Sequence, residues 1–165
     1  MTVAEALKQS KSRGLFHGKL IAYAQSQLTP QEDLLCAAIV MLTKMQLGGE
    51  HKLKYLNRME SSSKIKMLLC VTTKRLVFFN YMFGSAITYE LPLAQNPRLD
   101  ATQSKKGVGV GGLKLLTPEA TYYIAGNRKL TNYLKSGILA AFMVYQDQLK
   151  AAAQTDKPAQ QPDAE

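Results

Sequence analysis

Two apolar runs separated by a short polar break constrain the fold of this chain more than any other feature. The runs cover residues 65–71 and 76–81, and the break is the tetrapeptide Thr-Thr-Lys-Arg at 72–75. Together the runs are rich in Val, Ile, Phe and Tyr, which is typical of antiparallel strands joined by a turn. A helix would need a longer stretch without the break. We therefore predict strands at 65–72 and 75–82, and we expect the Thr and Arg side chains of the break to stabilise the turn rather than to bind a ligand.

This hairpin resembles a known family. An apolar strand, then Thr-x-Lys-Arg-Leu at 72–76, then an apolar-aromatic strand is similar to the bacterial pleckstrin-homology-like (PH-like) domains, especially the YokE-like group. Upstream, Leu-Thr-Pro-Gln-Glu at 28–32 resembles the Leu-x-Pro-Gly-Glu of that group, with Gln in place of Gly. The resemblance covers residues 28–150. It implies a mainly β fold: a bent seven-stranded antiparallel sheet or partly open barrel, capped by a C-terminal helix and preceded by short N-terminal helices.

The chain divides into an N-terminal helical extension (1–27), a PH-like domain (28–150) and a disordered tail (151–165) rich in Ala, Gln, Pro and acids. Thr2 and Glu5 form a capping-box pattern for a helix that we expect to end near Arg13. Residues 20–28 carry the apolar spacing of a second helix. The sequence leaves open whether these helices pack on the domain.

The run from Leu34 to Met45 fits either a helix or a buried strand. The resemblance favours one helical turn at Pro30 and then a strand from about Leu34 to Thr43. Further strands are expected at 86–91 and at 98–105, where the alternation is weak. Strands at 113–117 and 121–125 flank Pro118-Glu119, which is a hairpin signal.

A long closing helix is expected after Asn127, a plausible N-cap. Its apolar stripe consists of Leu130, Leu134, Ile138, Ala141, Tyr145 and Leu149. A second face, with Tyr133, Ala140 and Val144, should be exposed or covered by a partner or by the N-terminal helices.

The net charge of +9 is concentrated in the predicted domain. Lys44 to Lys135 contains fifteen Lys or Arg against five Asp or Glu, whereas the remainder contains six against seven. A basic domain favours anionic partners such as phospholipid headgroups, nucleic acid or an acidic protein surface. Scattered surface lysines that only maintain solubility are the alternative explanation.

A candidate anion site combines the first and the fifth connections of the sheet, which we expect to meet at one end. Its residues are Lys44, His51, Lys52, Lys54, Lys105 and Lys106. Backbone amides of the glycine run at 107–112 could add phosphate contacts. Eukaryotic PH domains hold phosphoinositides with basic residues on the first hairpin, and this spacing is similar but shorter and lacks the final Arg. Because Lys is a point charge, a diffuse contact with anionic lipid is expected.

The same glycine run contains G-x-G-x-x-G, but a dinucleotide site needs a following helix and an acidic residue further on. A strand-like segment follows instead, so we predict a glycine-rich loop. His17 and His51 have no partners at metal-ligand spacing. Cys36 and Cys70 form no C-x-x-C pair, which leaves buried thiols or a disulfide. We expect no enzyme activity, no metal site and no cofactor.

The N-terminus lacks the apolar region of a signal peptide, and the longest apolar runs are shorter than a membrane span. We therefore expect a cytoplasmic protein with peripheral membrane contact. The predicted function is a non-catalytic interaction module that binds a protein partner or itself through the sheet edge and the helix, with a subsidiary contact to anionic lipid. A homo-oligomer is implied by resemblance only. Nucleic-acid binding is the alternative; the aromatic residues near lysines are Tyr55, Tyr81, Tyr89, Tyr122 and Tyr123.

Overall fold

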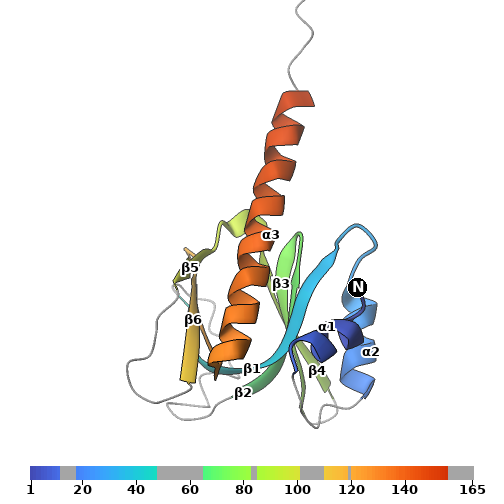
Figure 1. Cartoon of the computed structure of the whole chain (residues 1–165), viewed down its shortest axis with the longest axis vertical. Helices are drawn as coiled ribbons and strands as arrows, with labels where there is room; N and C mark the ends of the chain where they lie inside the picture. The colour runs from blue at the N-terminus through green and yellow to red at the C-terminus, as the bar shows by residue number, and fades with distance from the viewer. Residues whose placement is uncertain (12–17, 48–64, 83–84, 101–109, 119, 156–165) are drawn as a thin grey trace, which may run out of the picture.

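The computed structural model describes residues 1–11, 18–47, 65–82, 85–100, 110–118 and 120–155 (Figure 1). Its helices are α1 (Val3–Gln9), α2 (Gly18–Gln27) and α3 (Arg128–Thr155), with a 3-10 helix η1 (Leu93–Gln95). Its strands are β1 (Leu34–Leu47), β2 (Ile65–Thr72), β3 (Arg75–Met82), β4 (Ser85–Pro92), β5 (Arg98–Asp100), β6 (Val110–Leu116) and β7 (Ala120–Asn127).

The strands form one antiparallel sheet in the order β4-β3-β2-β1-β7-β6-β5. Strand β1 lies at the centre, and its residue Met41 pairs with Lys66 of β2 and with Ala125 of β7. Register shifts interrupt β1 near both ends, and such bulges bend a strand. The sheet curls into a half-barrel whose inner face is covered by α3 (Figure 1). This is the PH-like fold that the sequence predicted.

Helix α3 closes the inner face of the sheet. Leu134, Ile138 and Ala141 are completely buried in the inner core. The helix approaches β1 very closely at Gly137, where a Cβ atom would lie 2.2 Å from the Sγ of Cys36. A Cβ atom at this position would require the Cys36 side chain or the helix to shift. The predicted cap is confirmed, because the Leu130 amide donates to Asn127 Oδ1 at 2.8 Å.

Helices α1 and α2 cover the outer face of the first half of the sheet. Val3 and Ala6 of α1 are fully buried in a second core that includes Phe79. Thr2 and Glu5 form the predicted capping box. The Tyr133 hydroxyl of α3 donates to the carbonyl oxygen of Ala6 at 3.4 Å, so α1 contacts the closing helix as well. The N-terminal helices are therefore part of the packed structure.

The two cysteines point to opposite faces of the sheet. Cys36 belongs to the inner core under α3, whereas Cys70 belongs to the outer core under α1 and α2. Both are free and buried, so they act as small apolar side chains. Burial raises the pKa of the Cys36 thiol to about 12 and raises that of Cys70 as well.

Several predicted boundaries need correction. Helix α1 ends at Gln9 rather than near Arg13, because Lys11 adopts a left-handed φ of 51°. Residues 29–32 form a turn instead of a helical turn, closed by a hydrogen bond from the Glu32 amide to the Thr29 carbonyl at 3.1 Å. Strand β1 continues beyond Thr43 to Leu47. Helix α3 continues through 151–155, so the predicted start of a disordered tail at residue 151 is too early. The strands predicted at 65–72 and 75–82 are confirmed.

Candidate functional site

The turn between β2 and β3 is organised by the hydroxyl of Thr72. Its Oγ1 accepts hydrogen bonds from the amides of Lys74 at 3.2 Å and Arg75 at 3.0 Å. The same atom lies 2.9 Å from both Glu32 Oε2 and the Arg75 carbonyl oxygen, and its single hydrogen can be donated to one of them at a time. These hydrogen bonds of the Thr72 side chain stabilise the turn formed by residues 72–75.

Arg75 joins this turn to three other segments. It forms a bidentate ion pair with Glu32, with distances of 2.7 Å from Nη2 to Oε1 and 3.0 Å from Nε to Oε2. Its Nη2 also donates to the Gln27 carbonyl oxygen at 2.8 Å, and its Nη1 lies 2.7 Å from Glu90 Oε1. All these groups are paired with each other, which indicates that the cluster holds α2, the turn before β1, β3 and β4 together rather than binding a ligand.

The Glu32 carboxylate is held in its charged form. Burial by itself would raise its pKa, but hydrogen bonds from Arg75, the Thr29 amide and the Thr72 hydroxyl outweigh it and lower the pKa to about 2. Its hydrogen bond with Glu32 correspondingly raises the pKa of Arg75. This charged, buried pair is a structural junction.

Of the six residues predicted to bind anions, only Lys44 lies in a described segment. Its backbone is in β1, where it pairs with Tyr123 of β7. The other five, His51, Lys52, Lys54, Lys105 and Lys106, lie outside the described residues. The anion site thus stays a prediction.

The prediction assumed that the first and the fifth connections meet at one end of the sheet, and the strand ends that they join contradict this assumption. The first connection leaves β1 after Leu47, which pairs with Ala120 at the beginning of β7. The fifth connection enters β6 at Val110, which pairs with Asn127 at the end of β7. Strands β1 and β6 both run antiparallel to β7. The first connection therefore starts next to the beginning of β7, whereas the fifth connection finishes next to its end.

The glycine-rich loop predicted at 107–112 is wrong at its C-terminal end, because Gly111 and Gly112 already belong to β6. Gly112 lies within strand β6, and the strand continues to Leu116. A dinucleotide fingerprint would require a helix at this point. Within the described ranges, no three His, Cys, Asp or Glu side chains are close enough together to hold a metal ion.

The C-terminal part of α3 projects past the sheet (Figure 1). Of the four exposed large hydrophobic side chains in the described segments, three are on this helix: Leu139, Met143 and Leu149, which are 43%, 68% and 47% exposed. Leu149 follows the buried Ile138 by about three helical turns and continues the same stripe. On the second predicted face, Ala140 is exposed, Val144 is half-buried and Tyr133 contacts α1.

The second half of the sheet has an outer face that no described helix covers. Leu113, Leu115, Tyr122 and Ile124 belong to the inner core, so the alternating residues of β6 and β7 face outward. With their neighbours on β1, β2 and β5, the outward positions are Met41, Lys66, Arg98, Asp100, Gly112, Lys114, Leu116, Tyr123 and Ala125. We call this surface the open outer face.

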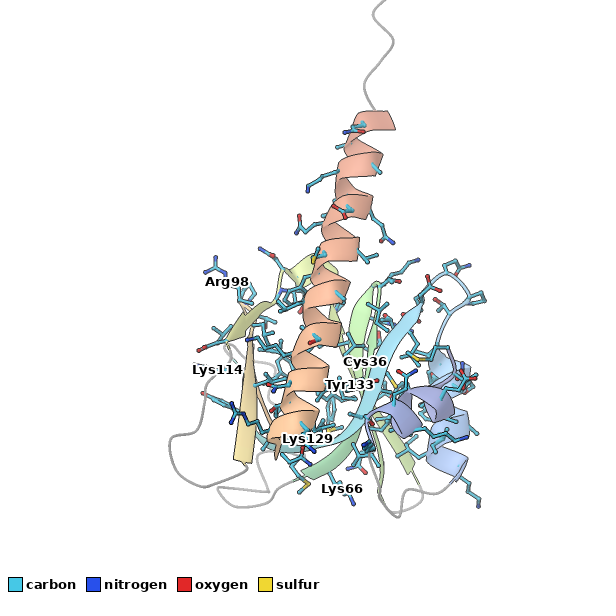
Figure 2. The ribbon with its side chains drawn as sticks, viewed as in Figure 1. Cys36, Lys66, Arg98, Lys114, Lys129 and Tyr133 are labelled. Atoms are coloured by element: carbon cyan, nitrogen blue, oxygen red, sulfur yellow. The ribbon has the colours of Figure 1, made fainter. Side chains whose placement is uncertain are left out.

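Lys114 and Tyr123 lie side by side on the open outer face. They pair across β6 and β7, and the Lys114 ammonium is 5.7 Å from the centre of the Tyr123 ring. Figure 2 shows Lys114 and Arg98 on the side of β5 and β6, and Lys66 at the lower end of β2. Sequence reasoning did not separate Tyr123 from the core tyrosines, although adjacent residues of a strand point to opposite faces.

Comparison with known proteins adds no relative: the chain matches no protein-family model and no curated protein sequence. Membership of the YokE-like group accordingly stays a prediction based on residues 28–32 and 72–76. Among the described helices, none has the length and apolar character needed to cross a membrane.

Proposed function

We propose that this protein is a non-catalytic interaction module that binds a protein partner or a second copy of itself through α3. The observation that carries the proposal is the projection of α3 beyond the sheet with Leu139, Met143 and Leu149 exposed. Leu139 and Met143 lie one turn apart on α3, and Leu149 continues the Ile138 stripe towards the end of the helix. Exposed apolar side chains that gather on one element are typical of an interaction site. The part of α3 that projects beyond the sheet is a short helical segment with no packing partner in the described chain. Such a segment has marginal stability in water, and packing against a partner would stabilise it.

The mass of the full chain in solution, measured by light scattering after size exclusion, tests self-association. We expect a mass well above the 18.2 kDa of one chain. Replacing Leu139, Met143 and Leu149 by Lys should return the mass to that of a monomer. A control that places Lys at Gln9 and Gln27, exposed positions on α1 and α2, should leave the mass unchanged.

A chain that stays monomeric at about 100 μM would exclude self-association and leave a different protein as the partner of α3. An oligomer that survives the three α3 substitutions would contradict the assignment of this helix. Contact with anionic lipid is a separate part of the proposal. It predicts co-sedimentation with anionic liposomes that is lost when Lys52, Lys54, Lys105 and Lys106 are all replaced by Glu.

A further inference from the structure

Four side chains form a diagonal line across the open outer face. Lys66 is on β2, Tyr123 on β7, Lys114 on β6 and Arg98 on β5. Lys66 lies in the same row of the sheet as Met41, Ala125 and Gly112. Lys114 and Tyr123 pair with each other two residues further along the strands. Arg98 pairs with Leu116, another two residues along. We call this line the basic track.

The basic track has an aromatic ring at its centre and cations at both ends. Lys66 and Arg98 are exposed, and Lys114 and Tyr123 are partly buried. The only acidic residue in these outward positions is Asp100, which pairs with Lys114 in the register, so the track keeps a net positive charge. A shallow pocket of about 330 Å³ adjoins Arg98 and is lined by Gln95, Asn96, Arg98, Leu116, Thr117 and Pro118.

The length of the track suits a short run of nucleotides. Four strand spacings of about 4.8 Å and four residues of about 3.4 Å separate Lys66 from Arg98, which gives roughly 23 Å along the diagonal. Sheet-based single-strand binders occupy sites of about 4 to 16 nucleotides, and this distance corresponds to the lower end of that range.

The combination of ring and cations favours a single strand over other polyanions. An unpaired base can stack on an exposed aromatic ring while its phosphates meet basic side chains. A duplex hides its bases and is read by elements that enter a groove, which the outer face of a curled sheet does not offer. The Lys114 side chain is long and flexible, so its ammonium can move from the ring to a phosphate when a base stacks.

We propose that the basic track binds single-stranded nucleic acid, with one base stacked on Tyr123 and phosphates contacted by Lys66, Lys114 and Arg98. This site is distinct from the α3 surface, so either proposal can fail without the other. Three phosphate contacts predict that the logarithm of the association constant falls with the logarithm of salt concentration with a slope of about −2.

The test is fluorescence anisotropy of the full chain with a fluorescein-labelled 12-nucleotide single strand of mixed sequence, as RNA and as DNA. Replacing Lys66, Lys114 and Arg98 together by Glu should weaken binding at least about 30-fold and remove the salt slope. A charge-matched control replaces Lys8, Lys19 and Lys135, which are exposed on the three helices, by Glu. The control should change affinity less than about threefold.

Stacking is tested at Tyr123. Tyr123→Ala should weaken binding about tenfold, whereas Tyr123→Phe, which keeps the ring, should stay within about threefold of the parent chain. Thermal unfolding of each variant checks that the fold is intact. The proposal is overturned by absence of binding, by equal losses in the track variant and the charge-matched control, or by an unlabelled duplex that competes as well as the single strand. Vesicles containing phosphatidylserine that bind through the track, with no oligonucleotide binding, would reassign it to lipid.

Discussion

The junction between Glu32 and Arg75 leads to a quantitative prediction about acid stability. The Glu32 side chain is 1% exposed, and its hydrogen bonds lower its pKa from 4.5 to about 2. Each pKa unit corresponds to about 1.4 kcal/mol, so the folded state favours the charged carboxylate by about 3 kcal/mol. Because the pKa is lower in the folded chain, this contribution is complete above pH 4.5 and is lost as the pH falls towards 2.

The substitution Glu32→Gln isolates this contribution. Urea denaturation followed by circular dichroism should show that the variant is about 3 kcal/mol less stable than the parent chain at pH 6. At pH 3, where the parent carboxylate has lost part of its advantage, the difference between the two chains should be about 2 kcal/mol smaller. The measurement needs only the two unfolding curves at each pH.

A neighbouring carboxylate supplies the matched control. Glu90 also pairs with Arg75 at 2.7 Å, but its side chain is 47% exposed. Solvent screens such a pair, so Glu90→Gln should cost less than about 1 kcal/mol at pH 6. The reasoning would be refuted if Glu32→Gln costs no more than Glu90→Gln, or if its cost is the same at pH 3 as at pH 6.

Three further predictions concern packing, capping and thiol access. Gly137→Ala should destabilise the chain by about 1–3 kcal/mol, because the new Cβ meets the Sγ of Cys36 at 2.2 Å; the added substitution Cys36→Ala should recover part of this loss in thermal unfolding, and no recovery would show that another atom resists the helix. Asn127→Ala removes the 2.8 Å cap to the Leu130 amide and should cost about 1 kcal/mol in urea unfolding, whereas Asn127→Asp should cost little. Cys36 and Cys70 are buried with raised thiol pKa values, so Ellman's reagent at pH 8 should label them only in unfolded chains; fast labelling of the native protein would contradict their burial.

The β2–β3 hairpin was predictable because its signals are local. The polar break supplies the turn, and each apolar run supplies one strand. The same locality explains the correct Asn127 cap and the capping box at Thr2. The seven-stranded PH-like sheet followed only from the family resemblance, because pairing between distant strands leaves no periodic signal in the sequence.

Strand β1 illustrates why periodicity alone was ambiguous. Ala37 and Ala38 are adjacent and both fully buried, one under α1 and α2 and the other under α3. A strand covered on both faces loses the alternation of polar and apolar residues and reads as a continuous apolar run. A helix segment can look the same.

The surfaces proposed for interaction were harder to predict than the fold. The apolar stripe on α3 was visible in the sequence. Which part of the stripe stays exposed could not be predicted, because it depends on where the sheet ends (Figure 1). The open outer face depends on register, because Lys66, Lys114 and Arg98 are distant in the chain and are aligned only by strand pairing. Such a surface has no local sequence signature.

The position of β1 between β2 and β7 also has a consequence for synthesis on the ribosome. Strands β1 to β4 and helices α1 and α2 are all complete by Pro92, but β7 begins only at Ala120. At about 5–20 residues per second, β7 emerges about 4–15 s after the end of β1. During that interval the part of β1 that later pairs with β7 is an open edge, and open edges recruit strands from other chains. The nascent protein is therefore exposed to aggregation through β1 until β7 has been made.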